Sequence, residues 1–174
     1  ARAGVDEATA FSTYAQIEGT VAALEATGQV AIVAPTGRKT QHTLQHMAPW
    51  VWSVGGEFWD PSKGRVVFDR PSAQNAILRF FRLHRGLAGR GFEGFSESDS
   101  DSYFGERRAA LTISGPWVVD EVTRRHPEVL FDLGVAALPG RPYTGGSSLV
   151  IWRRSLLNSE GLGLVRLLTS PDTQ

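Results

Sequence analysis

The chain of 174 residues contains no cysteine, so disulfides, zinc–thiolate sites and thiol nucleophiles are all excluded. It has no excess charge of either sign, because 18 basic residues balance 18 acidic ones. A neutral chain does not favour nucleic acid as a partner, since proteins that bind phosphate backbones usually carry a basic excess. The sequence also lacks an apolar run of the roughly 18–20 residues that a membrane-spanning helix needs, so we expect no membrane-spanning segment in it.

Glycine and tryptophan are the conspicuous residues that the chain does contain, with 19 and five copies. Many glycines indicate many turns and connections. Tryptophan offers a large flat surface with one polar atom, and it is common in cores and in carbohydrate-binding clefts. Short apolar strands and amphipathic helices alternate along the chain, which predicts an α/β fold.

The expected elements follow from apolar periodicity and from chain breakers. We expect helices over 12–28, 41–54, 71–87, 103–109 and 116–125 and from residue 158, strands over 29–34, 110–113, 131–139 and 145–152, and a hairpin over 57–69. The acidic, serine-rich residues 94–103 are expected to form an exposed loop. Ser114 is expected to cap the helix that Pro116 opens.

Short motifs that suggest nucleotide or metal binding each fail their structural context. GRGFEG over 89–94 follows a helix, whereas a dinucleotide site needs it after a strand. PTGRKT over 35–40 lacks the glycines of a phosphate loop, and ESDSDS over 97–102 lacks the later glycine and glutamate of a calcium loop. His42 and His46 can share a helix face, but no further metal ligands are evident. We therefore expect no metal and no cofactor.

A glycoside-processing enzyme is the alternative function, since such enzymes pair a carboxylic acid with a carboxylate base or nucleophile. The candidate carboxyls lie in one acidic segment: Glu93, Glu97, Asp99 and Asp101. The segment is polar, so nothing in the local sequence raises the pKa of one of these carboxyls above the others. The histidines stand at no recognisable spacing from a nucleophile. We expect the chain not to be an enzyme.

Five motifs occur in a fixed order along nearly the whole chain. They are GGEFWD (Gly55–Asp60), FDRP (Phe68–Pro71), GERRAALTISGPW (Gly105–Trp117), GVAALP (Gly134–Pro139) and LTSPDTQ (Leu168–Gln174). Together they resemble the family 1 extracellular solute-binding proteins, the receptors of ABC importers for sugars and oligosaccharides. The segment STYAQI over 12–17 is similar to the family's Thr-Trp-Asp-Glu segment, with Tyr14 in place of tryptophan.

The resemblance implies a periplasmic-binding-protein-like type II lobe, in which a mixed sheet is flanked by helices. Family members fold as two lobes around a cleft and are roughly twice as long as this chain, in keeping with domain size limits. Residues 1–146 then correspond to the second, C-terminal lobe. Residues 147–174 correspond to a crossover strand and helix of the first lobe. We expect such a fragment to bind sugar poorly by itself.

By the same resemblance, the chain is the substrate-binding component of an ABC transporter. It is expected to bind a sugar or oligosaccharide in an interlobe cleft and to deliver it to permease subunits in the membrane. The first ten residues do not follow the charged-then-apolar plan of a signal peptide. The expected location is extracellular or periplasmic, as a lipoprotein anchored through an N-terminal segment that this sequence does not include.

Trp117 is the main candidate for contact with a sugar. It begins a helix at the carboxyl end of a strand, where ligands of α/β sheets gather, and its ring suits the C–H face of a sugar. The alternative is that the ring covers the core, but a proline–tryptophan pair at a helix start favours the solvent-exposed edge. Gly115, beside this tryptophan, is a further candidate.

The other candidate site residues come from two segments. Gly145, Gly146 and Ser147 lie near the expected crossover, where glycine can approach a ligand, absorb hinge rotation or simply form a turn. His46 and Trp50 are assigned to the other wall of the cleft. Tryptophans at positions 50 and 52 cannot both face one way on a helix, so one is expected in the core.

Overall fold

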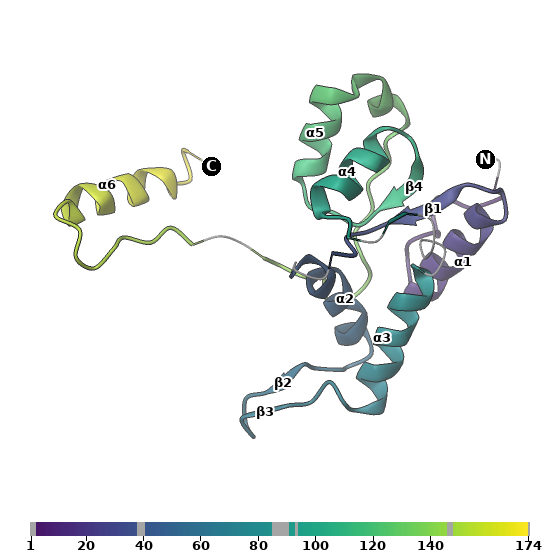
Figure 1. Ribbon diagram of the computed structural model, residues 1–174, viewed down its shortest axis with the longest axis horizontal. Coiled ribbons are helices and arrows are strands. Elements are labelled where there is room, and N and C mark those ends of the chain that lie inside the picture. Colours follow the sequence, from purple (N-terminus) through teal and green to yellow (C-terminus); the bar gives the residue numbers. More distant parts are fainter. Residues whose placement is uncertain (1–2, 38–40, 85–90, 93, 146–147, 174) are drawn as a thin grey trace. The chain divides into compact units, whose positions relative to one another are not determined.

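A computed structural model describes residues 3–37, 41–84, 91–92, 94–145 and 148–173. The chain divides into two compact units, Ala1–Tyr143 and Thr144–Gln174. Figure 1 labels their helices and strands.

The first half of the larger unit contains helices, a strand and a hairpin. They are α1 (Tyr14–Glu25), β1 (Val30–Val33), α2 (His42–Ser53), β2 (Trp59–Asp60), β3 (Arg65–Val66) and α3 (Pro71–Leu83). The capping pair expected for α1 is present, because the Thr13 hydroxyl accepts from the Gln16 N–H at 3.2 Å and donates to its side-chain Oε1 at 2.9 Å. In the hairpin, Trp59 lies opposite Val66 in an antiparallel pair.

The second half of this unit adds α4 (Glu97–Gly105), β4 (Ala109–Thr112), α5 (Trp117–Arg125) and a 3-10 helix (Pro127–Asp132). Strand β4 pairs parallel with β1, and Val33 lies opposite Thr112. The chain therefore leaves both strands at the same edge of the sheet, which is where α/β proteins place their ligands. The expected α/β class is confirmed, with the strands of the described residues in one parallel pair and one hairpin.

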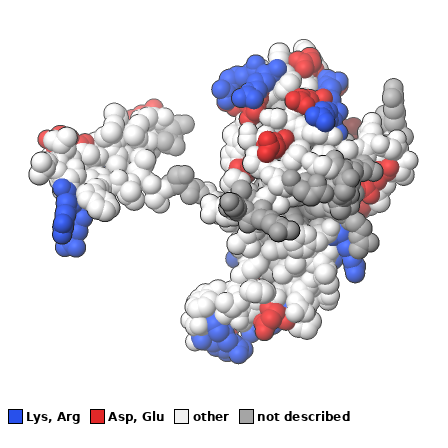
Figure 2. All heavy atoms as spheres, in the orientation of Figure 1, with Lys and Arg blue, Asp and Glu red and all other residues white. Residues whose placement is uncertain are grey.

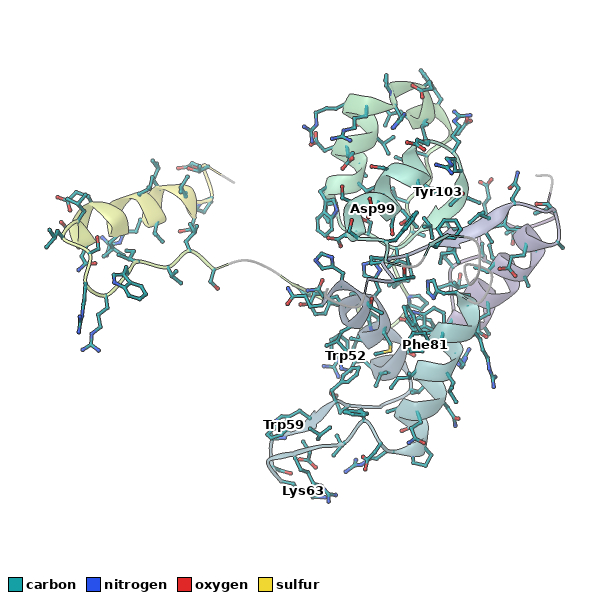
Figure 3. All side chains as sticks on the ribbon, in the orientation of Figure 1. Trp52, Trp59, Lys63, Phe81, Asp99 and Tyr103 are labelled. Atoms are coloured by element: carbon teal, nitrogen blue, oxygen red, sulfur yellow. The ribbon has the colours of Figure 1, made fainter. Side chains whose placement is uncertain are left out.

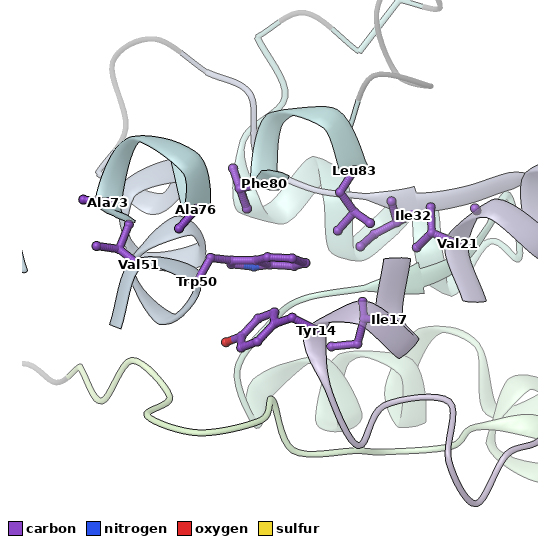
Figure 4. Close-up of a cluster of buried hydrophobic side chains, with 11 residues drawn as sticks. Tyr14, Ile17, Val21, Ile32, Trp50, Val51, Ala73, Ala76, Phe80 and Leu83 are labelled. Atoms are coloured by element: carbon purple, nitrogen blue, oxygen red, sulfur yellow. The ribbon is translucent and has the colours of Figure 1, made fainter. Parts of the chain in front are cut away.

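The core of the larger unit is built around Trp50, which is only 1% exposed. Its indole lies between the ring of Tyr14, at a centroid distance of 4.3 Å, and that of Phe80, at 6.2 Å (Figure 4). Ala73 and Ala76 are buried on α3, and their small side chains let α3 approach α2 closely. The core thus joins α1, α2 and α3.

Expectations about α4 and about the start of α5 are wrong. Residues 97–105 form a helix rather than an exposed loop, because Ser96 and Asp99 make a capping box and Asp101 is buried on the inner side. The helix expected over 103–109 therefore begins at Glu97. Ser114 does not cap α5, which has Pro116 at its N-cap position and no side-chain cap.

The strands expected over 131–139 and 145–152 are absent from the described residues. Residues 127–132 form the 3-10 helix, and the chain then runs on without a paired strand, although Leu138 packs against the core. A β-branched run forms a strand only where a neighbouring strand supplies hydrogen bonds and packing, and the described residues supply none here.

The smaller unit contains α6 (Asn158–Leu168), which confirms the expected last helix. Its preceding segment returns onto this helix, because Ile151 lies against Gly161. Several large apolar side chains of the unit are exposed: Val150, Trp152, Leu156, Leu157, Leu164 and Leu167. Of the helices that the structure describes in either unit, none combines the length and the apolarity of a membrane span.

Replacement of Trp50 by alanine is expected to lower the free energy of unfolding by about 3–5 kcal/mol, because it leaves a large cavity in the core. Trp59→Ala is the matched control, since Trp59 is 52% exposed on the hairpin (Figure 3), and its loss should be about 1 kcal/mol or less. Urea unfolding followed by circular dichroism measures both variants. Equal losses would contradict the assigned core.

Candidate functional site

The candidate site lies at the edge of the sheet where β4 ends and α5 begins. Trp117 is the first residue of α5, and it is 51% exposed. Pro116 stands immediately before it with a helical φ of −57°, so the proline ring fixes the direction in which the helix starts. A large aromatic side chain is thereby held at the edge of the sheet that favours ligands.

Gly115 is required by the position of the tryptophan ring. A Cβ atom added at residue 115 would overlap the six-membered ring of Trp117, so the indole is folded back over the glycine. This contact explains the order of residues in this turn, because only glycine leaves room for the ring above the backbone. One face of the indole is supported by the chain, and half of the residue remains open to solvent.

Asp101 fixes the polar edge of the same ring. The indole N–H of Trp117 donates to Oδ2 of Asp101 at 3.0 Å. Asp101 lies on α4 and is only 3% exposed. Burial raises the pKa of the Asp101 carboxyl above its ordinary value, while the neighbouring Ser114 hydroxyl and the Trp117 N–H act in the opposite direction.

Glu97 lies one turn before Asp101 on α4 and faces two histidines of α2. Its Oε2 is 3.7 Å from Nδ1 of His42, and its Oε1 is 3.7 Å from Nε2 of His46. These separations exceed direct hydrogen bonds, which leaves the polar atoms able to reorganise around a ligand or water. Burial raises the pKa of Glu97; His42 acts in the opposite direction, and the negative charge of Asp101 adds a smaller upward contribution.

His46 is uncharged at neutral pH. The pKa of its imidazole is lowered to about 4, mainly by burial, with a contribution from the nearby His84 and His42. Within the described ranges, no group of three or more histidine or acidic side chains is arranged to hold a metal ion.

The carboxylates around Trp117 give this part of the molecule a local negative charge. Asp101 has no lysine or arginine ion pair among the described residues, and Glu97 has only its histidine neighbours. Glu121, whose charge also raises the pKa of Asp101, is paired with Arg125 at 3.4 Å. Figure 2 shows acidic and basic side chains mixed over the part of the unit that contains α4 and α5.

The structure brings together some of the sequence-predicted site residues and separates others. Gly115 and Trp117 are in contact, and His46 reaches the same group of side chains through Glu97. Gly145 is exposed in the smaller unit. The predicted residues Gly146 and Ser147 lie outside the described residues.

The assignment of Trp50 to a cleft wall is corrected by its burial in the core. Of the two neighbouring tryptophans, Trp52 is the one at the surface of α2. Its ring stacks on Tyr143 with an interplanar angle of 5° and a centroid distance of 6.4 Å. The cleft candidate on α2 is therefore its first turn, with His42 and His46, rather than its tryptophans.

Sequence reasoning missed the pairing of Asp101 with Trp117, because it placed the acidic segment in a solvated loop. The signal that could have found it is the SESD pattern over 96–99, which is typical of a capping box. The serine side chain accepts from the backbone N–H of the aspartate, and the aspartate side chain accepts from the backbone N–H of the serine. Asp99 is used in this way, since its Oδ2 accepts from the Ser96 N–H at 2.8 Å (Figure 3). Once the helix is placed, Asp101 falls on its inner side.

No family model matches the chain, and no curated protein matches it in sequence. Its structure is similar to several solved structures, three of which are described below. One is an ABC transporter solute-binding protein from Thermotoga lettingae bound with α-D-tagatose, with a TM-score of 0.77 and 20% identity over 99% of this chain and 45% of that one. A second is maltose-bound MalE3 from T. maritima, with a TM-score of 0.73 and 22% identity over 93% of this chain and 44% of that one.

The third structure is a periplasmic-binding protein from Synechococcus sp., described as an oligosaccharide binder and crystallised in complex with zinc. It has a TM-score of 0.71 and 19% identity over 99% of this chain and 43% of that one. The chain thus spans less than half the length of each protein that it resembles. It has the periplasmic-binding-protein fold, which confirms at the level of fold the resemblance read from the five motifs.

Replacement of Ser96 by alanine is expected to destabilise α4 by about 1 kcal/mol, because the helix loses its capping box. Amide hydrogen exchange should speed up throughout α4. Ser98→Ala is the matched control, since Ser98 is exposed on the same helix, and it should leave the exchange unchanged. Similar exchange in the two variants would show that the cap does not hold this helix.

Proposed function

We propose that this chain belongs to the substrate-binding component of an ABC transporter, which binds a sugar or oligosaccharide and delivers it to a membrane permease. The observation that carries the proposal is Trp117, an aromatic ring fixed by Gly115 and Asp101 and half exposed at the carboxyl edge of a parallel pair. The similar proteins bound with tagatose and maltose support a carbohydrate ligand.

In this proposal the open face of Trp117 stacks on the C–H face of a sugar ring, and polar groups receive its hydroxyls. Glu97 can accept hydrogen bonds from hydroxyls, and His42 can donate or accept beside it. The opposite wall of the cleft comes from a first lobe that lies outside residues 1–146. Ligand contact with both lobes stabilises the closed form, which is then presented to the permease.

The assignment of residues 1–146 to the second lobe and 147–174 to a crossover strand and helix of the first is part of the same proposal. So are an extracellular or periplasmic location, attachment as a lipoprotein, and binding without catalysis. The glycoside-processing alternative requires free carboxyls. Asp99 caps α4 and Asp101 holds the indole, while Glu93 lies outside the described residues. Glu97, beside His42 and His46, is the candidate carboxyl that is left for it. An oligosaccharide that is hydrolysed rather than returned intact would establish the alternative.

Trp117→Ala is expected to weaken sugar binding by about 10- to 100-fold in a chain that carries both lobes, because stacking of the ring is lost. Calorimetric titration with a panel of neutral oligosaccharides measures the affinity. Trp59→Ala is the matched control, since Trp59 and Trp117 are exposed to 52% and 51%, and it should bind as the unchanged protein does. Unchanged affinity in Trp117→Ala would exclude the stacking role.

The charge of the site predicts a preference among sugars. Uronic acid oligomers should bind more weakly than neutral ones of the same length, because Glu97 repels their carboxylates. Glu97→Gln should recover roughly tenfold of the uronate affinity, whereas Glu25→Gln, at an exposed position on α1, should not. Competition titrations measure both. Equal binding of charged and neutral oligomers by the unchanged protein would contradict the prediction.

A further inference from the structure

We propose that Asp101 is a positioning residue, whose buried carboxylate holds the indole of Trp117 by its N–H so that one fixed ring face is presented to the ligand. The positioning stands on contacts within this chain. Its consequence for sugar affinity rests on the proposed function.

The first argument is the cost of burying this carboxylate. Asp101 is 3% exposed, and among the described residues no lysine or arginine forms an ion pair with it. An unpaired buried carboxylate is unfavourable unless hydrogen bonds to it offset the lost hydration. The structure provides the Trp117 N–H at 3.0 Å, from a residue 16 positions further along the sequence, and the Ser114 hydroxyl beside the carboxylate also favours its charged form. An apolar side chain would fill the same space without this cost, so the hydrogen bond is the reason for an aspartate at position 101.

The second argument is the way in which the ring is fixed. Pro116 fixes the backbone from which the ring projects, one face of the ring lies against Gly115, and the indole N–H donates to Asp101. A half-exposed tryptophan without such supports can change rotamer, and a ligand must then bear the entropic cost of immobilising it. The hydrogen bond therefore prepares the platform before the ligand arrives.

A consequence for recognition follows from the same bond. The indole N–H is the only donor of the tryptophan side chain, and it is already occupied by Asp101. Trp117 can thus contact a ligand through its ring face and not through a hydrogen bond. The hydroxyl groups of a sugar must then be recognised by other side chains. Among the described residues of the proposed site, Glu97 and His42 can do this.

The charges that face Asp101 determine how the bond responds to pH. Glu97 lies one turn away on α4, and Glu121 faces it from α5. On α2, His42 and His46 reach Glu97, and Ser114 lies beside the carboxylate at the end of β4. Burial raises the pKa of Asp101, so its proton is taken up above the pH at which an exposed aspartate titrates.

The first experiment is a pH titration of the Trp117 indole N–H resonance by NMR on this chain, with the resonance assigned from Trp117→Phe. In the unchanged chain, the resonance should shift with a midpoint above the ordinary range of aspartate. Asp101→Asn keeps an oxygen acceptor but cannot titrate, so this shift should disappear. Glu121→Gln is the matched control and should keep the shift, because Glu121 makes no bond to the indole.

The unchanged chain alone can overturn the proposal. A Trp117 N–H that does not titrate, or that exchanges with solvent as fast as a free indole, would show that Asp101 does not hold the ring. A shift that persists in Asp101→Asn would also overturn it. None of these outcomes depends on sugar binding, and the first two need only the unchanged chain.

The second experiment measures the effect on ligand affinity in a chain with both lobes. Asp101→Ala should weaken binding of neutral oligosaccharides by about threefold to tenfold, since the ring is no longer immobilised in advance. Asp101→Asn should restore most of this loss. If no sugar binds the unchanged protein, the proposed function fails while the NMR result still decides the positioning. Normal affinity in Asp101→Ala would overturn the link between the two.

Discussion

Parallel pairing of β1 with β4 is the constraint on which the candidate site depends. It makes the chain leave both strands at one edge, and it brings together segments that are far apart in sequence. After β1, the N–H groups of Thr36 and Gly37 donate to the carbonyl oxygen of Phe95, at 3.0 and 2.9 Å, just before α4 begins. Helix α4 is therefore held beside this edge, where Asp101 meets the tryptophan that follows β4.

Much of the local structure could be predicted because it is encoded locally. Helices α1, α2, α3 and α5 and strands β1 and β4 follow apolar periodicity and chain breakers, and all six lie close to their expected ranges. The segment over 97–105 was missed because its composition is that of a solvated loop, while its helix buries only Ser100, Asp101 and Gly105. The strands expected over 131–139 and 145–152 depend on pairing, which the described residues do not provide.

The site was predictable in part for the same reason. The Ser-Gly-Pro-Trp turn marks Trp117 from the sequence alone, but its partner Asp101 depends on how α4 packs against the end of β4. The spacing of Trp50 and Trp52 predicted that one of them lies in the core, but the sequence reasoning assigned Trp50 to the cleft wall, and it is Trp50 that is buried. Packing of α2 against α1 and α3 decides this, because it directs residue 50 toward Tyr14.

The charges of the site are held at a cost to stability. Burial raises the pKa values of Glu97 and Asp101, so the folded chain carries these carboxylates less favourably than the unfolded chain does. This cost is present above the folded-state pKa and is relieved as the pH falls through it. Ionisable side chains that are buried at a cost to stability are typical of functional positions, since packing alone would not favour them.

In the proposed binding site, the hydrogen bond between Trp117 and Asp101 separates the support of a ligand from its recognition. The aromatic support is maintained by Gly115, Pro116 and Asp101, while the polar rim is formed by side chains on α2 and the start of α4. Substitutions at the rim can therefore alter ligand choice without disturbing the support. In the proposed site, a new ligand preference can therefore arise by substitutions at the start of α2 and α4, with the turn and its aspartate unchanged.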